Sequence, residues 1–155
     1  YREGCDIAER CGHRLLYCLL VANIAEVLTL RNEEAGLEYA EKCYLLGRQN
    51  NDPYLIYCGA ISMARNLCLN RKMEEAWRYT READRLSKRY DFKNRSDIYN
   101  TYGEIALEAG DYMKAGLYYE QAIREHGFSQ AAYVVSTYVG YGSLPVAFSL
   151  LRSVR

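Results

Sequence analysis

The stretch that decides the fold runs from Ser96 to Phe128 and reads SDIYNTYGEIALEAGDYMKAGLYYEQAIREHGF. Two segments with apolar and small residues at intervals of three and four flank a turn at Gly110 and Asp111. Such intervals place these residues on one face of a helix. The two faces consist of Tyr99, Tyr102, Gly103 and Ala106, and of Ala115, Tyr118, Tyr119 and Ala122. The stretch therefore predicts two antiparallel helices, each with a face that needs a neighbour.

The same arrangement of small residues recurs along the chain. Three series of positions carry it: Ala25, Ala64 and Gly103; Gly36, Ala76 and Ala115; and Gly4, Cys43, Ala83 and Ala122. Every step within these series is 39 or 40 residues long. Agreement between three series indicates an internal repeat of helix pairs.

The residues from Tyr99 to Ala122 follow the pattern Tyr-x-x-Tyr-Gly-x-x-Ala-x-x-x-Gly-Asp-Tyr-x-x-Ala-x-x-Tyr-Tyr-x-x-Ala. This pattern resembles the tetratricopeptide repeat (TPR). The resemblance implies an all-α, right-handed α-α superhelix, a TPR solenoid of antiparallel helix hairpins. The chain departs from the family in two ways. Its repeats are 39 or 40 residues long, whereas TPR repeats are about 34 residues long. It also has Arg31-Asn32 and Arg71-Lys72 where Gly-Asp is usual. A repeat of this greater length is similar to the TPR repeats found in bacterial signalling proteins and transcriptional regulators.

We interpret residues 1–155 as one TPR-like domain excised from a longer protein. The expected repeats are 14–48, 53–89, 95–125 and a divergent 129–154, with 1–11 as the second helix of a truncated copy. Helices are expected at 1–11, 14–30, 33–48, 53–69, 73–89, 95–109, 112–125, 129–141 and 144–154. No stretch has the alternation typical of a strand.

The helix ends have recognisable signals. Asp52 before Pro53 predicts an N-cap followed by proline in the first turn. Further N-caps are expected at Ser96, Ser129 and Ser143, and left-handed helix ends at Gly47, Gly110, Gly127 and Gly142. The carboxylates of Glu33, Glu34, Glu74 and Glu75 are expected in solvated first helical turns.

Composition excludes several classes of protein. The 20 basic and 20 acidic residues cancel, which argues against a dedicated nucleic-acid or membrane-surface protein. The apolar run from Leu15 to Ala22 is far shorter than a membrane span, and the amino end does not resemble a signal peptide. We therefore expect a cytoplasmic domain.

The six cysteines lie in the first half of the chain, at positions 5, 11, 18, 43, 58 and 68. We expect free and mostly buried thiols, because no Cys-x-x-Cys pair or export signal occurs. A metal or redox role is the alternative, with Cys11-Gly-His13 as the nearest metal-like cluster. A zinc site needs four ligands at paired spacings, so we expect no metal and no cofactor.

We expect no enzymatic activity from these residues. The two histidines, His13 and His126, are far apart in the sequence, which disfavours a nucleophile–histidine arrangement. Phosphate-binding glycine motifs are missing from the sequence. The 16 tyrosines fall mainly at repeat positions and are expected to pack between helices.

The TPR resemblance implies a concave groove lined by the first helix of each pair. Carried over, the candidate peptide-binding residues are Asn23, Glu26, Ser62, Arg65, Asn100, Thr101, Glu104, Glu108 and Tyr133. Asn can bond both polar groups of a peptide backbone, and Arg65 offers a fork for a carboxylate. Glu26 and Glu104 would oppose the acidic tail that a chaperone-type clamp binds. The alternative is that these are ordinary solvated side chains.

The favoured hypothesis is a protein- or peptide-binding scaffold or regulatory domain of a larger bacterial protein. One alternative is a signal- or ligand-sensing domain that controls an attached output module, such as a transcription regulator or diguanylate cyclase. Another is a self-association module that forms a homo-oligomer through the apolar segment 144–154.

Overall fold

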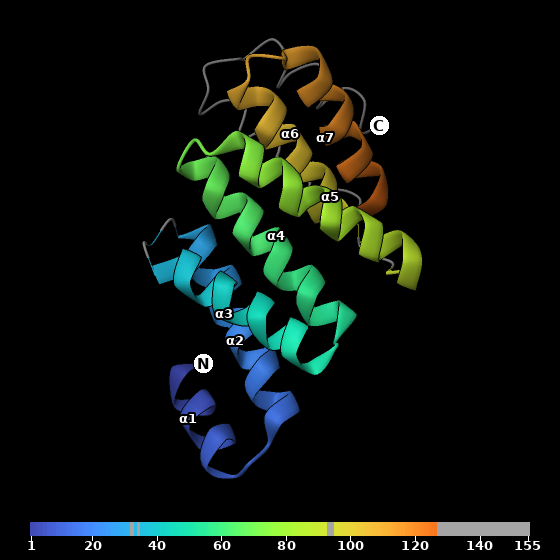
Figure 1. Cartoon of the computed structure of the whole chain (residues 1–155). Coiled ribbons are helices and arrows are strands. Elements are labelled where there is room, and N and C mark those ends of the chain that lie inside the picture. Colours follow the sequence, from blue (N-terminus) through green and yellow to red (C-terminus); the bar gives the residue numbers. More distant parts are fainter. Residues whose placement is uncertain (32, 34, 93–94, 127–155) are drawn as a thin grey trace. The chain divides into compact units, whose positions relative to one another are not determined.

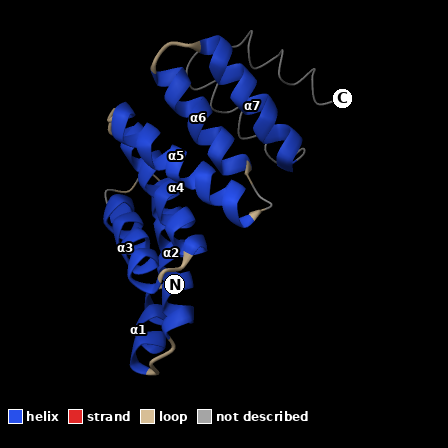
Figure 2. Ribbon diagram, turned by 45° about the vertical axis from the view of Figure 1, so that its right-hand side comes forward, coloured by secondary structure: helices blue, strands red, loops and turns tan. Residues whose placement is uncertain are grey.

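The computed structural model describes residues 1–31, 33, 35–92 and 95–126, and within them every regular element is a helix (Figure 1). The helices are α1 (Arg2–Arg10), α2 (Arg14–Leu30), α3 (Ala35–Asn50), α4 (Pro53–Leu69), α5 (Met73–Tyr90), α6 (Ser96–Glu108) and α7 (Tyr112–His126). The all-α prediction is confirmed for this part of the chain, as the colouring of Figure 2 makes plain. The expected helices at 129–141 and 144–154 lie outside the described residues.

The chain divides into two compact units, 1–91 and 92–155. The first contains α1 to α5, and each of these helices packs against the next along the chain. The second contains the described pair α6 and α7, which also pack against each other. Because the connections are short, successive helices within a unit run in opposite directions (Figure 1).

The helix ends confirm some predicted signals and correct others. Asp52 caps α4 by accepting hydrogen bonds from the backbone N–H groups of Tyr54 and Leu55. Gly110 adopts the predicted left-handed conformation, with φ of 77°. Arg71 has φ of 58° at the end of α4, so the residue that replaces the usual glycine there keeps the same backbone conformation.

Three predictions about helix ends were wrong. Ser96 lies inside α6, whose N-cap is Arg95. Gly47 lies inside α3, which continues for three more residues and is followed by the left-handed Asn51. Glu33 precedes α3 instead of lying in its first turn, and its carboxylate is 2.9 Å from Arg31 Nε. Glu74 and Glu75 do lie in the first turn of α5. The predicted signals at Gly127, Ser129, Gly142 and Ser143 fall outside the described residues.

The small residues that define the repeat are the points where helices meet. The first two series are buried at every position, from Ala25 to Gly103 and from Gly36 to Ala115. In the third series Cys43, Ala83 and Ala122 are buried. Gly4 is half-buried. Small side chains let helix backbones approach closely. The need for close approach at each helix contact explains why small residues recur every 39 or 40 positions.

Two glycines in the first unit permit direct contact between backbones. A Cβ atom on Gly59 of α4 would lie 2.5 Å from the backbone nitrogen of Tyr44 in α3. A Cβ atom on Gly47 of α3 would lie 2.5 Å from the backbone nitrogen of Ile56 in α4. Gly47 is therefore required for close helix packing and not for ending the helix.

In the second unit an aromatic ring occupies the space opposite a glycine. A Cβ atom on Gly103 of α6 would lie 2.7 Å from Cε1 of Tyr119 in α7, and Tyr119 is fully buried. The neighbouring rings of Tyr102 and Tyr118 stack with centroids 5.1 Å apart. These contacts confirm the predicted packing between helices for Tyr102, Tyr118 and Tyr119, whereas Tyr112, at the start of α7, is 51% exposed and does not follow the prediction.

Helices two apart in sequence also meet in the first unit. Asn66 of α4 donates a hydrogen bond of 2.7 Å to the hydroxyl of Thr29 in α2, and both side chains are buried. The Thr29 hydroxyl in turn donates to the carbonyl of Ala25. This pair fixes the position of α4 along α2, because a shift would leave buried polar groups without partners.

We predict that Asn66→Ala lowers the free energy of unfolding by about 2 kcal/mol, since it removes the hydrogen bond that the buried Thr29 hydroxyl accepts and also removes packing volume. Urea unfolding followed by circular dichroism measures the change. Gln49→Ala, which truncates an exposed amide on α3, is the matched control and should stay within about 0.5 kcal/mol of the parent. Equal losses for the two variants would show that the buried pair does not hold α2 and α4 together.

A second link joins α3 to α5. The Tyr44 hydroxyl donates to a Glu82 carboxylate oxygen at 2.9 Å, and the Tyr44 ring meets Tyr79 edge-on at 5.5 Å between centroids. Arg48 lies 3.7 Å from the same Glu82 side chain. Burial, aided by the hydrogen bond to Glu82, raises the pKa of Tyr44 to about 12, so the hydroxyl remains a donor at neutral pH.

All six cysteines are free, and four of them are buried, namely Cys5, Cys18, Cys43 and Cys68. Burial raises the pKa of the Cys43 thiol to about 12. A thiol that stays protonated at neutral pH is a poor nucleophile and metal ligand. Cys43 instead serves as a small packing residue in the core that also contains Leu55.

Candidate peptide-binding surface

The structure places eight of the nine predicted groove residues, and they lie in three different environments. Asn23 and Glu26 are exposed on α2, while Arg65 on α4 and Glu104 and Glu108 on α6 are half-buried. Ser62, Asn100 and Thr101 are buried, with exposed fractions of 8%, 3% and 0%. Tyr133 lies outside the described residues. Only part of the predicted set is therefore open to a ligand.

The buried members have local structural roles. The Thr101 hydroxyl donates to the carbonyl of Asp97, one turn earlier in α6. Ser62 lies on α4 next to the contact with α2, and its carbonyl accepts a hydrogen bond from Asn66. A ligand could not reach these groups without separating helices. Their assignment to a groove relied on family geometry, which does not account for the close packing of these particular helices.

The exposed face of α2 also carries apolar side chains that the sequence reasoning did not single out. Leu16, Leu19 and Val27 are 42%, 38% and 37% exposed. Together with Asn23 and Glu26 they recur at intervals of three and four, so they lie along one side of the helix. We call these five residues the α2 face. Leu15, at 60% exposed, adjoins it.

A comparison with α4 explains why this face is open. The residues 39 positions later are Leu55, Cys58, Ser62, Arg65 and Asn66. Three of them, Leu55, Ser62 and Asn66, are buried, because α2 and α3 pack against α4. The corresponding positions on α2 have no such cover among the described helices. The signal for this face in the sequence is the mixture of Leu16, Leu19 and Val27 with the polar Asn23 and Glu26 along one side of the expected helix.

The chemistry of the α2 face suits a peptide. Leu16, Leu19 and Val27 offer apolar surface, while the Asn23 amide can both donate to and accept from a main chain. The Glu26 carboxylate accepts N–H donors or pairs with a basic group. Apolar anchors combined with a few polar groups that fix orientation are typical of recognition surfaces.

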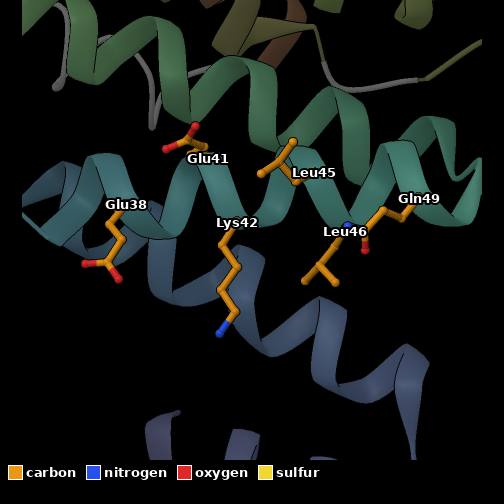
Figure 3. Close-up of a pocket in the computed structure, with 6 residues that line it drawn as sticks. All are labelled: Glu38, Glu41, Lys42, Leu45, Leu46 and Gln49. Atoms are coloured by element: carbon orange, nitrogen blue, oxygen red, sulfur yellow. The ribbon is translucent and has the colours of Figure 1, made fainter.

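A shallow depression of about 340 Å³ lies elsewhere, on the outer face of α3 (Figure 3). Its lining residues all belong to this one helix and are Glu38, Glu41, Lys42, Leu45, Leu46 and Gln49. Lys42 extends toward α2, where its Nζ lies 5.3 Å from the centroid of the Tyr17 ring. A hydrogen bond to the Tyr17 hydroxyl raises the pKa of Lys42. A hollow walled by a single helix gives little enclosure, so we do not take it as a small-molecule site.

Comparisons with known proteins identify no relative of the chain: no family model, no curated protein sequence and no solved structure matches it. Within the described ranges, no three histidine, cysteine or acidic side chains converge in a way that would hold a metal ion. The described helices also include none with the length and apolar character needed to cross a bilayer.

Proposed function

We propose that the chain is a TPR-like helical-repeat domain that binds a protein or peptide, as a scaffold or regulatory part of a larger cytoplasmic bacterial protein. The single observation that carries this proposal is the burial of small residues at steps of 39 and 40. Burial at each step supports the proposal that a similar pair of helices is built several times around equivalent small residues. Repeated helix hairpins of this kind commonly present extended binding surfaces.

The contacts of the first unit support a stacked arrangement. First helices α2 and α4 lie against each other through Thr29 and Asn66, and second helices α3 and α5 through Tyr44 and Glu82. Contact between like helices of successive pairs is what a solenoid requires. We propose further that the helix pairs form a right-handed superhelix over the whole chain.

The binding surface that we propose is the α2 face together with Arg65. It retains the exposed or half-buried members of the predicted groove in the first unit and omits the buried Ser62. The ligand is a peptide segment with an apolar side chain for the leucines and a backbone or basic group for Asn23 and Glu26. Recognition on such a surface requires no catalytic group.

Site-specific cross-linking in the source cell tests the proposal first. A photoreactive residue at position 23 should trap a defined partner, whereas the same residue at the exposed position 49 on α3 should not. A peptide from the trapped contact is then synthesised and its affinity is measured by calorimetry.

We predict that the double substitution Leu19→Glu with Val27→Glu weakens this peptide by about tenfold or more, because it places charge in the apolar contact. Leu45→Glu, which changes a similarly exposed leucine on α3, should leave the affinity unchanged. Helix content is compared by circular dichroism in all variants. Equal trapping at positions 23 and 49, or equal affinities, would refute the assignment of the α2 face.

A further inference from the structure

The zero net charge of the chain conceals an uneven distribution. Ten of the 20 basic residues fall between positions 65 and 95, together with only five of the 20 acidic residues. The flanking parts of the chain therefore carry a net negative charge. The excess of positive charge coincides with α5 and its ends.

The structure concentrates this charge on one side of α5. The buried residues of α5 are Ala76, Thr80, Ala83 and Ser87, which form a single stripe. At about 100° per residue, the opposite side of the helix carries one acidic residue, Glu74, and five basic residues, which are Arg78, Arg81, Arg85, Lys88 and Arg89. All five are exposed. We call these five residues the basic face of α5.

The acidic residues of α5 neutralise only part of this face. Lys88 is paired with Asp84 at 2.7 Å, while Arg85 lies 4.0 Å from Glu82 with 75% of its side chain exposed. Glu82 is already shared between Tyr44 and Arg48. Neither Arg78 nor Arg81 has a carboxylate partner among the described residues. Two guanidinium groups one turn apart are thus available to a ligand.

The basic face is not a general property of second helices. The residues of α3 that lie 40 positions before Arg78 and Arg81 are Glu38 and Glu41, and both are exposed. Like charges three or four residues apart destabilise a helix slightly. The pair Arg78 and Arg81 therefore has a small cost in stability, and a negatively charged ligand would offset it.

We propose that the basic face of α5 binds a short acidic peptide segment of a partner protein. From Arg78 to Arg89 the face spans about 16 Å along the helix, the length of about five residues in extended conformation. Arginine forks bind carboxylates in a bidentate manner. Trp77, which is 39% exposed at the edge of the face, provides an apolar contact for a side chain between the acidic ones.

Two other negatively charged ligands fit less well. A nucleic acid carries charge continuously along its length, whereas the excess of positive charge here is confined to α5 and its ends and the rest of the sequence is net negative. A helix that anchors stably at a membrane surface combines basic residues with an apolar face that inserts between lipids. On this side of α5 the exposed apolar side chains are limited to Trp77 and, at the end of the helix, Tyr90.

Fluorescence anisotropy tests the proposal with a labelled probe of sequence Glu-Asp-Glu-Leu-Asp-Glu-Glu. The amide analogue Gln-Asn-Gln-Leu-Asn-Gln-Gln, a random-sequence DNA duplex and vesicles containing phosphatidylserine are the comparison ligands. The double variant Arg78→Gln with Arg81→Gln removes two exposed charges. Arg10→Gln with Arg124→Gln removes two exposed charges from α1 and α7 and is the matched control.

We expect the acidic probe to bind and the amide analogue not to bind. Arg78→Gln with Arg81→Gln should weaken the acidic probe by about tenfold, while the control pair changes it by less than about twofold. Binding should also fall steeply between about 50 and 300 mM salt. Equal weakening by the two variant pairs, equal binding of the amide analogue, or tighter α5-dependent binding of DNA or vesicles would overturn the proposal.

Discussion

Gly59→Ala should lower the free energy of unfolding by about 3 kcal/mol, because the added methyl group overpacks a contact between two backbones. Its Cβ atom would lie 2.5 Å from the nitrogen and 2.6 Å from the Cα atom of Tyr44. No rotamer change can relieve a contact with a main chain, so α3 and α4 have to move apart. The higher helix propensity of alanine offsets only about 1 kcal/mol of this loss. Urea unfolding followed by circular dichroism measures the difference.

Gly4→Ala is the matched control for this substitution. A Cβ atom on Gly4 would meet only the end of the Leu20 side chain, with Cδ1 at 3.2 Å. That flexible group can turn aside, so the gain in helix propensity should leave the variant as stable as the parent or slightly more stable. If Gly59→Ala behaves like Gly4→Ala, α3 and α4 do not approach as closely as described.

Ala115→Arg should destabilise the pair α6 and α7 by about 4 kcal/mol or more, because it forces a long charged side chain into a closed contact. Ala115 has no exposed surface. It is also the third-repeat member of the series that begins with Gly36 and Ala76. A large loss at this position would therefore confirm the repeat register as well as the local packing.

Leu117→Arg provides the comparison for Ala115→Arg. Leu117 lies two residues further along α7 and is 61% exposed, so arginine is accommodated there with a change within about 0.5 kcal/mol. Circular dichroism reports on all helices, whereas the fluorescence of Trp77, the single tryptophan, reports on the first unit. Similar stabilities for the two arginine variants would contradict the assigned helix face.

Much of the fold follows from patterns that act locally. Apolar intervals of three and four and the pair Asp52-Pro53 predicted α4 with both ends as the structure has them. The interval of 39 or 40 residues identified the buried small positions. These patterns predict the helices correctly because helix formation and close contact between helices restrict which residue types can occupy each position.

The errors arise where tertiary contact overrides a local signal. Glycine is typical of helix ends, but Gly47 lies inside α3 because a Cβ atom there would collide with the backbone of Ile56. Ser96 has the chemistry of an N-cap, yet it is fully buried inside α6. Glycine and serine serve several purposes in proteins, and the neighbouring helix that decides between them is not visible in the local sequence.

The candidate site was predicted less completely than the fold. Family geometry led to Asn23 and Glu26, which are exposed, but also to Asn100 and Thr101, which are buried. The exposed leucines of α2 were overlooked because they follow the pattern of a buried helix. The basic face of α5 was overlooked because the total charge of the chain is zero. Both features become apparent only when each side chain is assigned to a covered or an open face.

The central claim is that small residues buried between successive helices bring the helix backbones into contact, and nuclear Overhauser effects measure this contact directly. At 17.9 kDa the isotope-labelled chain is suited to the experiment. The account predicts strong cross-peaks from the Gly59 α-protons to the Tyr44 amide and from the Gly47 α-protons to the Ile56 amide. Absence of both, in spectra that contain the sequential amide contacts within α3 and α4, would contradict it.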